Sequence, residues 1–63
     1  MASEVSRHEF GMTDKGAVVV IAKEQFTDDG ESKFLTFQVR HGVRTVGDYK
    51  TFKAASAVAE ALV

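Results

Sequence analysis

Cysteine, proline and tryptophan are absent from this chain of 63 residues. The absence of cysteine excludes disulfides and cysteine-based zinc sites. The two histidines lack the paired spacing of a zinc motif, so we expect neither a metal nor any other cofactor. No run of about 18 apolar residues is present, which predicts that no segment crosses a membrane.

We also expect no signal peptide, because the first residues, Met-Ala-Ser-Glu-Val-Ser-Arg, contain no apolar stretch. We therefore expect a cytoplasmic protein. Apolar residues make up 44% of the chain and charged residues 27%, a balance typical of a globular domain. At this length we expect a single domain over residues 1–63, with residues 1–4 as a disordered tail.

The net charge of −1 conceals a division along the chain. Residues 1–32 carry seven acidic and three basic side chains, a net charge of −4. Residues 33–63 carry two acidic and five basic side chains, a net charge of +3. Such asymmetry indicates charged partners, although it does not determine the fold.

Three glycine-containing turns divide the first three quarters of the chain. Residues 13–16 and 27–30 share the pattern Thr-Asp-x-Gly, and His41-Gly42 is a third turn. In this pattern Asp can accept a hydrogen bond from the backbone two residues on, and Gly supplies the positive φ that closes a hairpin.

Between these turns the sequence predicts strands, and after them a helix. The segment 33–40 alternates, with Leu35, Phe37 and Val39 on one face, and the β-branched run 17–22 is typical of a central strand. Residues 43–49, bent at Gly47, and residues 5–12 are the other candidate strands. The predicted fold is α+β: an antiparallel β-meander of three to four strands with one C-terminal helix packed on one face.

The predicted helix follows Thr51, which is a suitable N-cap. Its apolar residues have helical spacing, and we expect them to cover Leu35, Phe37 and Val39; they are Phe52, Ala55, Val58, Ala59 and Leu62. The opposite sheet face then contains Phe34 and part of the 18–21 run. Either the sheet curls into a partial barrel, or this face pairs with another molecule.

No group of residues in the sequence has the composition of an active site. His8 and His41 are isolated, no serine lies in a Gly-x-Ser-x-Gly elbow, and no glycine-rich loop opens the predicted helix. The acidic residues 28–31 lack the spacing and the terminal glutamate of a calcium loop, which favours a solvated hairpin tip. We therefore expect no enzymatic activity.

The acidic first half supports a protein-binding module whose partner has a basic surface, such as that of a protein that handles nucleic acid. We assign this contact to Glu24, Asp28, Asp29, Glu31 and Phe34. In size and organisation the chain resembles the inhibitor proteins of phages and mobile elements, including anti-CRISPR proteins, which implies an inhibitor or accessory protein. A homodimer through an edge strand or the uncovered face is also an alternative.

The basic second half supports an alternative function, the binding of nucleic acid through one face of the sheet. The candidate residues are Gln38, Arg40, Arg44, Lys50 and Lys53. Residues 44–55 resemble the sheet-to-helix turn of two related families of DNA-binding domain, the ethylene-response-factor type and the arm-binding type of phage integrases. The matching positions are Val46, Gly47, Tyr49, Thr51 and Ala55. The resemblance implies a three-stranded sheet that lies in the major groove of DNA.

Overall fold

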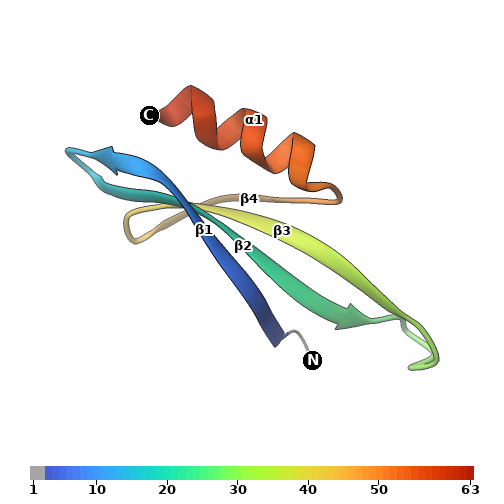
Figure 1. Cartoon of the computed structure of the whole chain (residues 1–63). Helices are drawn as coiled ribbons and strands as arrows, with labels where there is room; N and C mark the ends of the chain where they lie inside the picture. Colours follow the sequence, from blue (N-terminus) through green and yellow to red (C-terminus); the bar gives the residue numbers. More distant parts are fainter. Residues whose placement is uncertain (1–2) are drawn as a thin grey trace.

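The computed structural model of the chain describes residues 3–63, which form four strands and one helix (Figure 1). The elements are β1 (Ser3–Thr13), β2 (Gly16–Phe26), β3 (Lys33–His41), β4 (Arg44–Tyr49) and α1 (Phe52–Leu62). The strands form one antiparallel sheet in the order β1-β2-β3-β4, and α1 lies across one face of it. The predicted α+β meander with a C-terminal helix is confirmed.

The glycines of the three predicted turns all have positive φ, as the hairpin pattern requires: 122° at Gly16, 73° at Gly30 and 64° at Gly42. Gly16 and Gly42 also bring two hairpins together. Their turns are in backbone contact at the same end of the sheet, where the Gly42 N–H donates to the Ala17 carbonyl at 2.9 Å.

The helix begins where the sequence predicts, since the Thr51 hydroxyl accepts a hydrogen bond from the Ala54 N–H at 3.1 Å. Ala55 and Ala59 are fully buried, and they pack on the central strands. The small core consists of Val18, Val20, Val39, Ala55 and Ala59, flanked by partly buried residues such as Phe10, Phe37 and Leu62. Because alanine has a short side chain, the helix can lie close to the sheet.

Two expectations about the strands need correction. Ser3 and Glu4, which we placed in a tail, belong to β1, where Glu4 pairs with Lys23; residues 1–2 of that expected tail lie outside the described residues. Leu35 was expected beneath the helix, but its side chain is 44% exposed. Of the three β3 residues expected beneath the helix, only Phe37 and Val39 pack there, because β3 extends past the helix N-terminus (Figure 1).

As the sequence predicts, the sheet face without the helix contains Phe34 and part of the 18–21 run. Val19 and Ile21 lie on this face, yet they are only 8% and 1% exposed. Their neighbours in the ladder have long polar side chains: Glu9 and Arg40 beside Val19, and Arg7 and Gln38 beside Ile21. The aliphatic parts of such side chains can cover apolar surface while their polar ends stay in water. We call this the open face.

The helix is 11 residues long, or about 17 Å, whereas the apolar part of a bilayer measures about 30 Å. Within residues 3–63, no helix is long and apolar enough to cross a membrane.

Candidate functional site

The β2–β3 hairpin projects beyond the helix as an arm, which we define as residues 24–35 (Figure 1). The arm contributes to the elongated shape of the molecule, which measures 41 × 20 × 16 Å. Three of its apolar side chains are about half exposed: Phe26, Phe34 and Leu35. The arm therefore combines a regular backbone with apolar surface that the protein's own core does not cover.

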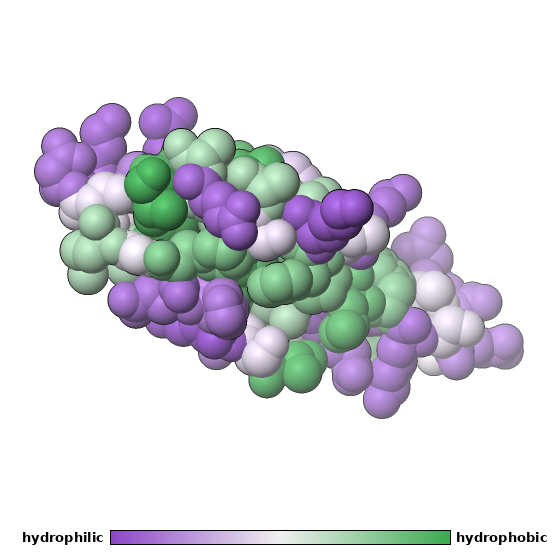
Figure 2. Space-filling model, turned by 45° about the horizontal axis from the view of Figure 1, so that its top comes forward, coloured by the Kyte–Doolittle hydropathy of each residue, from purple (hydrophilic) through white to green (hydrophobic). Residues whose placement is uncertain are grey.

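The turn at the end of the arm, residues 27–32, is closed by its own hydrogen bonds. The Thr27 N–H donates to the Ser32 carbonyl at 2.9 Å, and the Gly30 N–H donates to the Thr27 carbonyl at 2.8 Å. We call Asp28, Asp29 and Glu31 the acidic tip; all three are exposed. Figure 2 shows hydrophilic side chains gathered at this end of the molecule.

One of the three carboxylates stabilises the turn itself. Asp29 accepts hydrogen bonds from the Thr27 hydroxyl and, at 3.0 Å, from the Glu31 N–H. Both bonds favour the ionised form, and the Thr27 bond, followed by the Glu31 bond, lowers the pKa of the Asp29 carboxyl. The carboxylates of Asp28 and Glu31 take no part in these bonds, so they are the ones at the tip that a partner can engage.

Along the arm, Glu24 is already paired. Its carboxylate lies 3.6 Å from the Lys33 ammonium on the neighbouring strand, and the same ammonium lies 5.5 Å from the centre of the Phe26 ring. The Glu24 side chain is 39% exposed and the Lys33 side chain 57% exposed. The structure thus places all five predicted partner-binding residues on one arm, but Glu24 and Asp29 have structural partners there.

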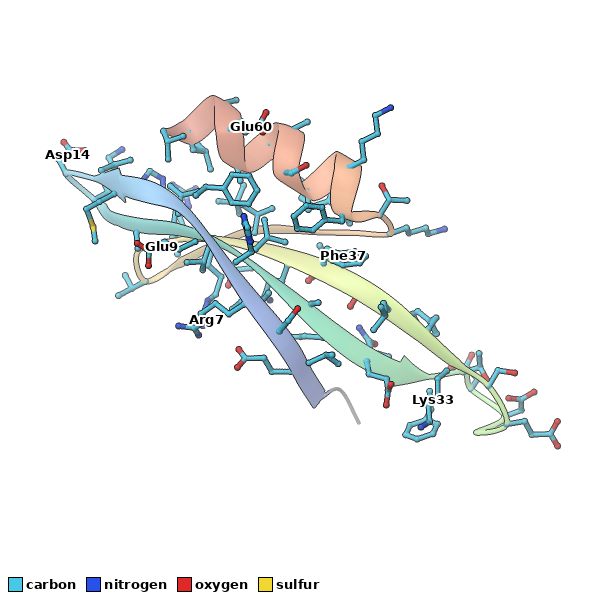
Figure 3. The ribbon with its side chains drawn as sticks, viewed as in Figure 1. Arg7, Glu9, Asp14, Lys33, Phe37 and Glu60 are labelled. Atoms are coloured by element: carbon cyan, nitrogen blue, oxygen red, sulfur yellow. The ribbon has the colours of Figure 1, made fainter. Side chains whose placement is uncertain are left out.

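The two exposed apolar residues of β3 lie on opposite faces of the arm. Phe34 lies on the open face, as expected, whereas Leu35 lies on the face that carries the helix farther along the sheet. Figure 3 shows Lys33 far out on the arm, away from Phe37, which lies next to the helix.

The five residues predicted to bind nucleic acid are not brought together. Gln38 and Arg40 lie on the open face, whereas Arg44 lies at the β3–β4 turn and lines a hollow with Leu62 of the helix. Lys50 and Lys53 lie at the other end of β4, where the chain enters the helix. The basic residues of the second half therefore occupy three places, not one face.

Within residues 3–63, the open face has no excess of positive charge. Its cations are Arg7, Lys23 and Arg40, and its anions are Glu4, Glu9 and Asp48. Arg7 lies 3.6 Å from Glu4, and Figure 3 shows Arg7 and Glu9 on the same side of β1. Because phosphate binding depends on uncompensated cations, this mixture does not favour tight electrostatic binding of nucleic acid.

At the end of the sheet opposite the arm is a hollow of about 300 Å³. Its lining residues are Lys15, His41, Arg44, Thr45, Val46 and Leu62. His41 joins the two turns there through Nε2 and the Thr13 hydroxyl. His8 packs edge-on against the rings of Phe10 and Phe52. Within residues 3–63, no group of three or more histidine or carboxylate side chains is placed to hold a metal.

Sequence reasoning missed Phe26 and Leu35 as surface residues and missed the arm as a whole. The signal lay in the lengths of the elements. A strand of 11 residues such as β2 spans about 36 Å, whereas the 11-residue helix spans about 17 Å. A helix that packs on the middle of such a strand must leave one or both of its ends uncovered.

No protein-family model matches the chain, and no curated protein and no solved structure is significantly similar to it.

Proposed function

We propose that this protein is a small, non-enzymatic binding module that contacts a basic surface of another protein through its arm. The observation that carries the proposal is the combination on the arm of exposed apolar side chains with the carboxylates of Asp28 and Glu31. Apolar area supplies affinity when it is buried, and charge complementarity raises the association rate and selects the partner.

The partner class follows from the sign of the charge. Surfaces that bind nucleic acid are rich in lysine and arginine, and acidic side chains can occupy the positions that phosphates would take. We therefore propose a nucleic-acid-handling protein as the partner and competition with nucleic acid as the mode of action. The resemblance in size and organisation to phage-encoded inhibitors, such as anti-CRISPR proteins, supports this role.

The test is a pull-down from host lysate, followed by a binding titration with the purified partner that it identifies. The test variant is Asp28→Lys/Glu31→Lys, which leaves the turn-forming Asp29 in place. The matched control is Asp14→Lys/Glu60→Lys, which changes the net charge equally at two exposed sites away from the arm (Figure 3). We expect the first variant to lose at least tenfold in affinity and the control to bind like the wild type. Equal affinities for both variants would contradict the proposal.

Nucleic-acid binding is the second candidate, because Gln38 and Arg40 lie on the same exposed face and the buried Nε of Arg40 has no hydrogen-bond partner. A titration against duplex and single-stranded DNA at low and physiological salt separates the two functions. Micromolar binding that weakens steeply with salt would favour this candidate over the protein-binding one. In Arg40→Ala, the slope of log affinity against log salt concentration should then fall in magnitude by about 1.

A further inference from the structure

We infer that the outer edge of β3 at residues 33–36 accepts an extended segment of the partner as an additional strand, antiparallel to β3 and with basic residues at its C-terminal end. This inference rests on the proposed function and specifies how the arm would hold its partner. Strand addition to an open sheet edge obtains affinity from main-chain hydrogen bonds and specificity from alternate side chains.

The edge is open because β4 is shorter than the strand beside it. β4 pairs with β3 from Phe37 to His41, and its last partner is Tyr49 opposite Phe37. β3 continues to Lys33 and pairs there with β2 alone. Residues 33–36 therefore have a neighbour on one side, and alternate N–H and C=O groups on the other side point away from the sheet.

The other edges of the sheet carry features that discourage pairing. β1 has register shifts at Val5 and Phe10, and β4 is only six residues long with a shift at Val46. Such bulges and short strands disrupt a template for another strand. In contrast, β2 and β3 pair without a shift over nine successive positions. The edge at residues 33–36 thus belongs to the most regular part of the sheet.

The side chains at this edge are suited to a strand with apolar residues in the middle. Phe34 is 45% exposed on the open face, and Leu35 is 44% exposed on the other. An incoming strand places consecutive residues on alternate faces, so the residues opposite Leu35 and Phe34 would each cover one of these side chains. We therefore expect two consecutive apolar residues at these positions.

Charge determines which end of the segment is basic. A strand antiparallel to β3 runs in the direction of β4, so its N-terminal end lies beside Thr36 and its C-terminal end beside Lys33. The acidic tip lies next to Lys33 at the end of the arm, whereas Lys50 follows Tyr49 at the other end of the open edge. In the incoming segment, basic residues are therefore favoured on the C-terminal side of the residues that pair with β3 and disfavoured on their N-terminal side.

The probe is the peptide Thr-Val-Val-Thr-Lys-Lys-Lys with blocked ends, and the reversed sequence Lys-Lys-Lys-Thr-Val-Val-Thr is its control of equal composition. Amide hydrogen exchange by NMR detects the added strand directly. At about ten times the dissociation constant, the outward N–H groups of residues 33–36 should exchange about tenfold more slowly. The inward N–H groups, already bonded to β2, should change little. Equal protection by the reversed peptide would overturn the assigned direction.

Two variants test the edge itself. Leu35→Lys places a charge on the edge and should abolish the protection. Val43→Lys makes the same type of change at a side chain that is 99% exposed at the far β3–β4 turn, and it should leave the protection intact. Protection that persists in Leu35→Lys would overturn the inference.

Trilysine separates this inference from the proposed function, because it engages the acidic tip without forming a strand. Shifts of the Asp28 and Glu31 carboxyl signals with trilysine, without edge protection by the longer peptide, would overturn strand addition and leave the proposed function standing. If none of the three peptides shifts the carboxyl signals or protects the edge amides, both the inference and the proposed function are contradicted. A doubled mass by light scattering without peptide, lost in Leu35→Lys, would show that a second copy occupies the edge, and this too would overturn the inference.

Discussion

Replacement of Gly42 by alanine tests whether the contact between two hairpin turns stabilises the fold. Gly42 has a φ of 64°, and a Cβ atom there would lie 2.1 Å from the Lys15 carbonyl oxygen. Gly30 has a similar φ of 73°, but a Cβ atom there would meet nothing within 4 Å. The pair Gly42→Ala and Gly30→Ala therefore separates the cost of close contact from the cost of the left-handed backbone.

The left-handed conformation costs an alanine about 1–2 kcal/mol, and this applies to both variants. In Gly42→Ala the turns must also separate by about 0.9 Å to reach the 3.0 Å below which real Cβ contacts are essentially absent. That movement breaks the 2.9 Å hydrogen bond from Gly42 to Ala17 and strains the contact between His41 and Thr13, each worth about 1 kcal/mol. We expect total losses of about 3–4 kcal/mol for Gly42→Ala and about 1–2 kcal/mol for Gly30→Ala.

The measurement is urea denaturation followed by circular dichroism, with the free energy of unfolding extrapolated to water. A domain of 63 residues has a typical stability of about 3–9 kcal/mol, so Gly42→Ala is expected to lose about a third of it or more and Gly30→Ala clearly less. Values for the two variants that agree within about 0.5 kcal/mol would refute the argument that the turn contact is tight.

Three further predictions concern the core, the helix and the arm. Ile21→Ala should cost about 2–5 kcal/mol in urea denaturation, because Ile21 is 1% exposed on the face without the helix; a loss below about 1 kcal/mol would show that face to be loosely packed. Thr51→Ala should cost about 1 kcal/mol by removing the N-cap bond to Ala54, and Thr51→Ser should restore most of it. Asp29 has a lowered pKa in the folded arm, so its stabilising effect is complete above the unfolded-state pKa and is lost as the pH falls through the folded-state value. The protection of the Glu31 amide, which is its exchange rate relative to that of an unstructured amide at the same pH, should therefore fall on acidification, and Asp29→Ala should remove this dependence.

The sequence alone was sufficient for three strands, the helix and their order along the chain, but it left open whether the first segment joins the sheet as a fourth strand, β1. The alternation in β3, the β-branched run in β2 and the helical spacing after Thr51 depend on local periodicity, which a single chain displays directly. The turns were equally predictable, because Gly16, Gly30 and Gly42 occupy positions where positive φ is needed. The acidic tip followed from the same turn pattern.

Only the tertiary structure decided which surfaces are available. Whether Leu35 is buried depends on where the helix begins relative to β3, and the alternation of β3 is the same in either case. The separation of Arg40 from Arg44 depends on strand register and on the turn between them, so net charge in the second half gave a misleading impression of one basic surface. The open edge at residues 33–36 likewise exists because β4 stops at Tyr49, opposite Phe37, whereas β3 begins four positions farther out, at Lys33. Periodicity specifies what each segment becomes, but the relative lengths and offsets of packed segments specify which side chains remain for a partner.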